Sequence, residues 1–199
     1  MPLVPIDHSE ITTTITTDEC NYLQYHQHQH HHYYHHDQDR QPKPTYQVYC
    51  RADNKSALTI RDNKVILAPS NPSDPRQHWY KEHKFGTQVK DEIGLPSFAL
   101  VNKATGEAIQ HGVAGAQLVQ LLKYYEPNDD SVDHSILWSE ACIKDDNGEY
   151  KAIRMVNNIG MNMDAFGATK ERGGVQDGTA IGLWEWNGGD NQRWKIIPY

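Results

Sequence analysis

The stretch GLWEWNGGDNQRW, residues 182–194, holds three of the five tryptophans in this chain of 199 residues. Its last residue, Trp194, closes the short motif NQRW, and the related motifs RQHW and SILW close on Trp79 and Trp138. The closing tryptophans are 59 residues (79 to 138) and 56 residues (138 to 194) apart. Such a spacing is typical of a chain built from repeated structural units.

Each repeat opens with alternating apolar residues that break at polar residues or glycine, as a strand does when it enters a turn. The opening stretches are YQVYCRADN from Tyr46, FALVNKATG from Phe98 and IRMVNNIGM from Ile153. Each repeat later returns to an apolar strand, namely KVILAP from Lys64, QLVQLLKYY from Gln117 and TAIGLWEW from Thr179. No long segment follows the 3.6-residue period of a helix. The sequence therefore predicts an all-β domain of short strands, in which three units close around one core.

The tryptophans of the first quoted stretch are predicted to differ in role. Trp194 is expected to fill the core at the end of its unit, as are its two counterparts. Side chains alternate between the two faces of a strand, so Ile181 and Leu183 are expected to point inward and Trp184 and Trp186 outward. An outward Trp184 favours a ligand platform, although the preceding loop could instead cover it. Trp186 could brace the Asn-Gly-Gly turn that follows it.

Residues 1–45 are predicted to form a disordered tail. Eight of the twelve histidines precede Thr45, and the segment YHQHQHHHYYHHDQD shows neither a helical nor a strand period. Such a composition buries too little apolar surface to offset the entropy lost on ordering. Two interpretations stay open, a solvated leader without a role of its own or a metal-binding tract. The candidate metal ligands are His28, His30, His31, His32, His35 and His36, and neither a metal nor another cofactor is expected in the remaining domain.

Bulk properties exclude several classes of protein. A net charge of −7 and an isoelectric point near 5.9 argue against a nucleic-acid partner, which would need a basic face. No apolar run approaches the ~20 residues that cross a bilayer, and the first residues lack the basic and apolar regions of a signal peptide. The cysteines, Cys20, Cys50 and Cys142, are odd in number and in no metal-ligand spacing. They are expected to stay reduced, in the cytoplasm or nucleus.

The domain resembles the Euonymus-type lectin domain of plants, a ricin-B-like β-trefoil. The resemblance covers residues 46–199 and rests on the ends QHW and QRW and on LTIRDNKVILAPSNPSDPRQHWYK, FALVNKATGEA, IRMVNN and LWEWNGGDNQRWK. It implies a β-trefoil of three four-stranded units, at about 46–97, 98–152 and 153–199. It also implies a non-catalytic lectin for galactosylated or mannose-type glycans, resident in cytoplasm and nucleus and often linked to stress.

The family's pattern implies a sugar site in the third unit. Such a site needs a carboxylate for paired hydroxyls, amides as donors and an aromatic ring for the apolar face of the sugar. The third unit supplies Asp164, Trp184, Asn191 and Gln192, with Phe166 as a candidate second aromatic contact. Ricin-type galactose sites often carry glutamine two residues before the aromatic, where this chain has Gly182. The glycine removes a polar contact and leaves room for a larger sugar, so a strict galactose preference is not expected.

Aligned by sequence, the other two units lack this combination. The first offers Asp62, Ala68, Arg76 and Gln77, and the second offers His111, Leu122, Ser135 and Ile136. Tyr124 and Tyr125, close to Leu122, leave a second site open. The preferred interpretation is one glycan site on a monomer or weak dimer.

The alternative function is a protein-interaction scaffold with a metal-binding tail, because a trefoil by itself decides no function. An enzyme is not expected. The sequence has no nucleophile elbow, phosphate-binding loop or His-Glu zinc motif. Its acidic run EPNDDSVD is typical of a solvated loop.

Overall fold

A computed structural model describes residues 42–112, 118–125, 133–144 and 148–199. These residues form twelve strands and four 3-10 turns. The strands are β1 (Tyr46–Cys50), β2 (Asp53–Arg61), β3 (Lys64–Pro69), β4 (Trp79–Glu82), β5 (Ser97–Asn102), β6 (Glu107–Gln110), β7 (Gln120–Lys123), β8 (Trp138–Cys142), β9 (Lys151–Met155), β10 (Asn158–Ala165), β11 (Thr179–Glu185) and β12 (Trp194–Pro198). The turns are η1 (Pro75–Gln77), η2 (His134–Ile136), η3 (Lys170–Arg172) and η4 (Asp190–Gln192). The candidate histidine ligands of the tail lie outside the described residues.

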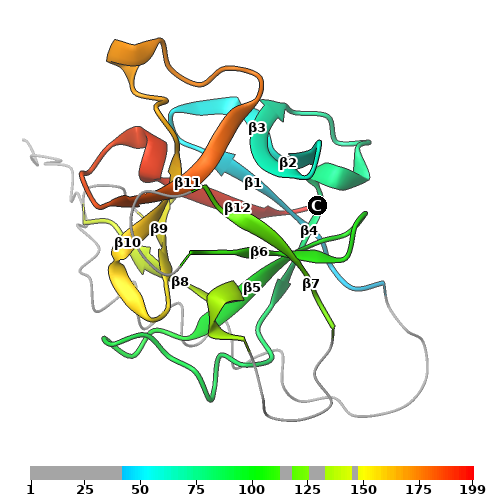
Figure 1. The fold of residues 1–199 in the computed structure, drawn as a ribbon, viewed down its shortest axis with the longest axis vertical. Helices are drawn as coiled ribbons and strands as arrows, with labels where there is room; N and C mark the ends of the chain where they lie inside the picture. Colours follow the sequence, from blue (N-terminus) through cyan, green and yellow to red (C-terminus); the bar gives the residue numbers. More distant parts are fainter. Residues whose placement is uncertain (1–41, 113–117, 126–132, 145–147) are drawn as a thin grey trace, which may run out of the picture.

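The first and last strands of the three repeats, which are labelled in Figure 1, pair into a closed, six-stranded barrel. Around the ring, β1 pairs with β4, β4 with β5, β5 with β8, β8 with β9, β9 with β12, and β12 again with β1. The two middle strands of each repeat form a hairpin, β2 with β3, β6 with β7 and β10 with β11. A closed ring has no free strand edge. The arrangement confirms the predicted all-β trefoil of three four-stranded units.

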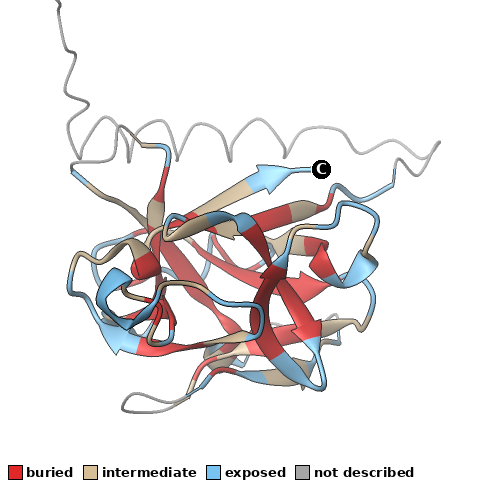
Figure 2. Ribbon diagram, turned by 90° about the horizontal axis from the view of Figure 1, so that it is seen from above, coloured by how far each residue is buried: buried red, intermediate tan, exposed pale blue. Residues whose placement is uncertain are grey.

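The closing tryptophans occupy equivalent positions in the three repeats and fill the core. Trp79, Trp138 and Trp194 follow η1, η2 and η4, and all three are fully buried. Their indole N–H groups donate hydrogen bonds to the backbone carbonyls of Leu58 (3.0 Å), Ile109 (3.0 Å) and Met163 (2.8 Å), respectively. Figure 2 shows the buried residues concentrated along the strands. The core role predicted for Trp194 is confirmed.

The three indole hydrogen bonds also align the repeats residue by residue. The residue that follows the accepting carbonyl is Asp164 in the third unit, Thr59 in the first and Gln110 in the second. The sequence alignment, which placed Asp62 and His111 there, is therefore wrong. Asp62 lies instead in the turn between β2 and β3, with a left-handed φ of 51°. The error arises because the hairpins differ in length, from nine residues in β2 to four in β6.

The described chain contacts the domain before β1 begins. The hydroxyl of Thr45 lies 3.3 Å from Nδ1 of His78, and the Thr45 carbonyl accepts a 2.8 Å hydrogen bond from the backbone N–H of Tyr199. Lys43 forms an ion pair with Glu82. Lys43 and Thr45, which the sequence predicts to belong to the tail, therefore contact the domain.

The two cysteines of the described residues differ in state. Cys50 is a free thiol in the core, and burial raises its pKa to about 12. Cys142 is disulfide-bonded, so the prediction that all thiols stay reduced is wrong at Cys142. The number and spacing of cysteines in a sequence do not show which thiols meet in space.

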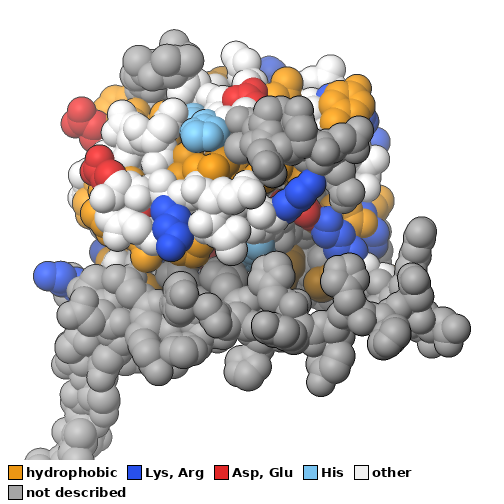
Figure 3. All heavy atoms as spheres, turned by 90° about the horizontal axis from the view of Figure 1, so that it is seen from below, with side chains coloured by type: hydrophobic (Ala, Val, Ile, Leu, Met, Phe, Trp, Pro, Cys, Tyr) orange, Lys and Arg blue, Asp and Glu red, His pale blue; other side chains and the backbone are white. Residues whose placement is uncertain are grey.

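The described residues contain no helix long and apolar enough to cross a membrane. Within the same ranges, no group of three His, Cys, Asp or Glu side chains could hold a metal ion. On the face that Figure 3 shows, lysine and arginine side chains are interspersed with acidic ones. This face therefore presents mixed charge.

Candidate functional site

The hairpin of β10 and β11 carries a carboxylate and an exposed aromatic ring on one face. Asp164 lies opposite Gly182 in the strand register, and Asn162 lies opposite Trp184. Paired residues project to the same face, as do residues two apart on one strand. Asp164 and Trp184 are therefore diagonal neighbours. Trp184 is 44% exposed and Leu183 is buried, which confirms the predicted outward direction of Trp184.

The Asp164 carboxylate is almost fully buried and is held by the turn before the closing tryptophan. The amide Nδ2 of Asn191 donates a 2.9 Å hydrogen bond to Oδ2 of Asp164, which is only 3% exposed. Burial raises the pKa of Asp164 to about 6, and hydrogen bonds from Gln192 and Asn191 oppose the rise. A carboxylate with so little hydration gains when a ligand hydroxyl donates a hydrogen bond to it.

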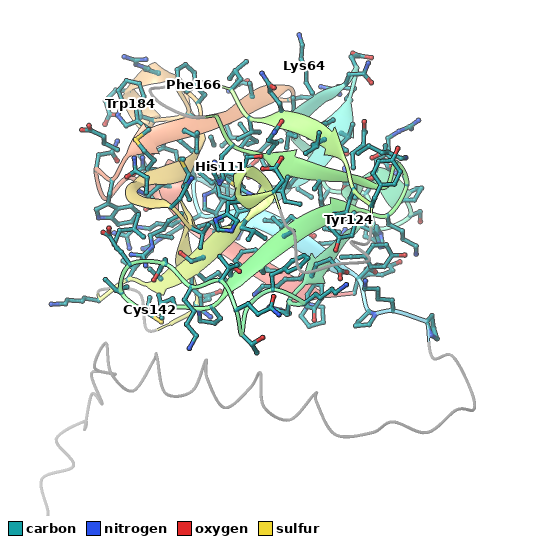
Figure 4. All side chains as sticks on the ribbon, turned by 60° about the horizontal axis from the view of Figure 1, so that its bottom comes forward. Lys64, His111, Tyr124, Cys142, Phe166 and Trp184 are labelled. Atoms are coloured by element: carbon teal, nitrogen blue, oxygen red, sulfur yellow. The ribbon has the colours of Figure 1, made fainter. Side chains whose placement is uncertain are left out.

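Phe166 lies beside Trp184, immediately after the end of β10. Its backbone N–H donates a 2.9 Å hydrogen bond to the carbonyl of Ala180 on β11. The ring centroids of Phe166 and Trp184 are 6.1 Å apart, and the ring planes meet at 69°. Figure 4 shows both rings at the same edge of the molecule. The two side chains therefore form one exposed aromatic edge beside Asp164.

Gln192 is buried, and its side-chain amide is used within the fold. Its Nε2 donates to the carbonyl of Glu185 (2.9 Å), and its Oε1 accepts from the backbone N–H of Asn187 (2.9 Å). Gln77 makes the same two bonds to the equivalent turn of the first unit, at 3.0 and 2.8 Å. Because Gln77 does so in a unit without an aromatic platform, the role is structural. We therefore do not count Gln192, a contact expected from sequence, among the direct sugar contacts.

Trp186 is also exposed, as predicted, at 42%, but it is tied to its own turn. The guanidinium of Arg193 lies 5.9 Å from the centre of the Trp186 ring, and Arg193 also donates to the carbonyl of Gly188 (3.2 Å). The backbone N–H of Trp186 donates to the carbonyl of Gly160 (3.3 Å). These contacts favour the interpretation in which Trp186 braces the turn.

The corresponding surfaces of the first two units lack both key groups. In the strand register, the position of Trp184 is taken by Ala68 in the first unit and Leu122 in the second. At the carboxylate position, the Thr59 hydroxyl and the Gln110 amide donate hydrogen bonds within their own units. Neither unit offers a charged acceptor beside a ring at these two positions.

One residue beside the third hairpin was missed by the sequence reasoning. Leu118, from the second unit, pairs with Gly182 in an isolated antiparallel bridge, and the N–H of Val119 donates to the Ile181 carbonyl (3.0 Å). Leu118 is 48% exposed and Val119 is buried. The strand predicted from Gln117 includes Leu118, but strand periodicity does not reveal which hairpin a strand will adjoin.

Comparison with curated proteins identifies close relatives, although no protein-family model matches the chain. The chain is 52% identical over 158 residues to the ricin B-like lectin R40G3 of Oryza sativa subsp. japonica, which covers 79% of this chain and 75% of the relative. It is 53% identical over 157 residues to the ricin B-like lectin EULS3 of Arabidopsis thaliana, covering 79% and 48%. The chain thus spans about half of the Arabidopsis protein.

Solved structures share the fold at low sequence identity. The Macrolepiota procera ricin B-like lectin, in complex with lactose, aligns with a TM-score of 0.56 at 16% identity over 80% of this chain and 99% of that one. The designed three-fold symmetric protein ThreeFoil aligns with a TM-score of 0.54 at 19% identity over 77% and 97%. At these identities the likeness concerns the fold alone. Taken with its relatives at about half identity, the chain belongs to the non-catalytic ricin B-like lectins, in their Euonymus-type branch.

Proposed function

We propose that the chain binds glycans through one site in its third trefoil unit, formed by Asp164, Trp184 and Asn191, with Phe166 as an adjoining contact. The observation that carries the proposal is the exposed Trp184 ring diagonal to the hydrogen-bonded Asp164 carboxylate. The equivalent positions of the other two units hold neither an aromatic ring nor an acid. Two proteins of this fold support the ligand class, since their structures contain lactose and GalNAc.

Each group supplies a different part of sugar recognition. The Trp184 ring offers a flat apolar surface for the C–H face of a pyranose. The Asp164 carboxylate accepts hydrogen bonds from one or two hydroxyls, and charge-assisted bonds of this kind are the stronger ones. Asn191 holds the carboxylate in place. The site therefore fits a neutral sugar that presents a hydroxyl pair on one edge and C–H groups on one face.

The class of glycan proposed is galactosylated or mannose-type. Gly182 lies opposite Asp164 and adds no side chain beside Trp184. The site is therefore less restrictive than one with a polar side chain at this position. We do not propose a strict preference for galactose.

A glycan array probed with the purified chain tests the proposal, with titration of the bound glycans. Asp164→Asn should abolish binding, because it removes the charged acceptor while preserving side-chain shape. Gln110→Ala, at the equivalent position of the second unit, is the matched control and should bind like the parent. Equal losses in both variants would contradict the site. Undiminished capture of enzymatically deglycosylated partners would favour the protein-interaction scaffold instead.

From the resemblance to Euonymus-type lectins, we propose that the protein resides in the cytoplasm and nucleus and that its expression is linked to stress. Disulfides are rare in those compartments, so the bonded state of Cys142 stands against this location. Imaging of a fluorescent fusion under control and osmotic-stress conditions tests both points. Retention in the secretory pathway would overturn the proposed location.

A further inference from the structure

Gly182 lies at the centre of a row of three residues that crosses strand β11. On one side it pairs with Asp164 of β10, and on the other side it pairs with Leu118 of the second unit. Both pairings are antiparallel, so the three residues face the same side of the sheet. That side also carries Trp184, two residues along β11. A sugar above Gly182 would therefore have the carboxylate on one edge and Leu118 on the other.

The spacing of this row suits a single pyranose. Neighbouring strands lie ~4.8 Å apart, so two strand spacings place Asp164 and Leu118 roughly 10 Å apart at the backbone. Diagonal neighbours on adjacent strands are in reach of aromatic and long side chains, which places Leu118 within range of a ligand stacked on Trp184. The side chain of Leu118 is 48% exposed, while the next residue, Val119, is buried. Leu118 therefore offers an apolar surface at the edge of the site.

We propose that Leu118 determines specificity at this site, by contacting a methyl group on the sugar edge opposite the hydroxyls bound by Asp164. The proposal rests on the proposed function, because it assumes that the sugar stacks on Trp184. A leucine cannot accept or donate a hydrogen bond, so a hydroxyl directed at it loses its water without a replacement partner. A methyl group has no hydrogen bonds to water to lose, and its burial against leucine is favourable. Two common substituents supply that methyl, the acetamido group of an N-acetylated sugar and the terminal carbon of a 6-deoxy sugar.

The test compares sugars that differ only at this substituent. Galactose, N-acetylgalactosamine and 6-deoxygalactose are titrated into the full chain by NMR, together with mannose, N-acetylmannosamine and 6-deoxymannose. Burial of one methyl is worth ~0.8 kcal/mol. We therefore expect the unmutated chain to bind a methyl-bearing sugar about four-fold more tightly than the matching sugar without the methyl. The methyl-bearing sugar that is favoured identifies the source, acetamido or 6-deoxy.

Three variants decide the role of Leu118. Leu118→Ala should bind the matched sugars equally, whereas Leu118→Met, which keeps an apolar side chain, should retain the preference. Ile93→Ala removes a similarly exposed side chain (58%) from the loop between β4 and β5 and should behave like the parent. A parent without a preference, or a preference that survives Leu118→Ala, overturns the inference. Trp184→Ala tests the glycan site separately from the role of Leu118. Unchanged glycan binding in Trp184→Ala would show that the site itself is misplaced.

Discussion

The side-chain amide of Asn191 donates a 2.9 Å hydrogen bond to the Asp164 carboxylate, which joins the last turn of the third unit to its hairpin. Equivalent bonds run from Thr59 to the Arg76 carbonyl and from Gln110 to the Ser135 hydroxyl. The link between these two positions is therefore a feature of the fold. What the third unit adds is an acid at one end of the link and an exposed ring beside it.

Glycan binding is expected to depend on pH through Asp164. Its pKa is raised to about 6 by burial, and only the ionised carboxylate can accept hydrogen bonds from two hydroxyls. Affinity should be constant above neutral pH and fall as the pH drops below about 6. Because bound hydroxyls stabilise the charged form, the midpoint should shift to lower pH at saturating glycan. Titration between pH 4.5 and 8 checks this, and an affinity that is flat across the range would contradict it.

Ionisation of Asp164 should lower the stability of the fold, although it favours glycan binding. Its folded pKa of about 6 exceeds the ordinary value of 3.8, so the folded protein binds more protons than the unfolded chain between these values. Ionisation of Asp164 therefore lowers the free energy of unfolding as the pH rises through about 6. Asp164→Asn, which mimics the neutral acid, should melt at or above the parental temperature at pH 7. The difference should vanish near pH 4, and a variant that melts well below the parent at pH 7 would contradict the burial argument.

Gln77 and Gln192 should prove equivalent in stability. Each ties its turn to the end of the third strand of its unit with two hydrogen bonds. Replacement by alanine removes both hydrogen bonds of a buried side chain, and a typical bond of this kind contributes ~0.5–1.5 kcal/mol. We expect Gln77→Ala and Gln192→Ala to lower the melting temperature by similar amounts. If Gln192→Ala kept its melting temperature but lost glycan binding, Gln192 would be a direct contact after all.

The sequence was sufficient for the fold because the repeat is marked by residues with strong physical constraints. Trp79, Trp138 and Trp194 are large apolar residues that recur at the same place in each repeat, and their spacing defines the units. Strand alternation likewise predicted the buried and exposed positions of β11, including the outward Trp184. These features depend on residue size and on a period of two, which the sequence displays directly.

Position-by-position equivalence between units could not be predicted in the same way. The hairpins differ in length, so counting from the opening strands misplaced the counterparts of Asp164 at Asp62 and His111. The bridge from Leu118 to Gly182 joins separate units, and strand periodicity carries no information about such pairings. The residue type of Gln192 fits a sugar contact. Its hydrogen bonds in the structure, which the sequence does not predict, show that its side chain holds its own turn.

A single site per chain predicts weak monosaccharide binding. Three or four net hydrogen bonds of ~1 kcal/mol each and a stacking contribution give a Kd on the order of mM. Tyr124, a sequence candidate for a second site, packs against a hydrophobic cluster that is built mostly from second-unit residues. NMR titration with a monosaccharide should therefore perturb amides of β10 and β11 and of the adjoining Leu118 and Asn191, but not those near Tyr124. Perturbation near Tyr124 with a second affinity would contradict this, as would strong agglutination by a strictly monomeric sample, since avidity requires linked sites.

The most direct test of the central claim compares Trp184→Ala with Trp194→Ala, using thermal melts and a glycan array. Trp194 is a buried core residue, and truncation of such side chains costs ~3–5 kcal/mol of the ~5–15 kcal/mol that stabilises a domain. Trp194→Ala should therefore melt far below the parent. Trp184→Ala removes an exposed ring and should change stability by less than ~0.5 kcal/mol, while glycan binding disappears. If Trp184→Ala unfolds the domain, or binds glycans like the parent, the glycan site is not on the hairpin of β10 and β11.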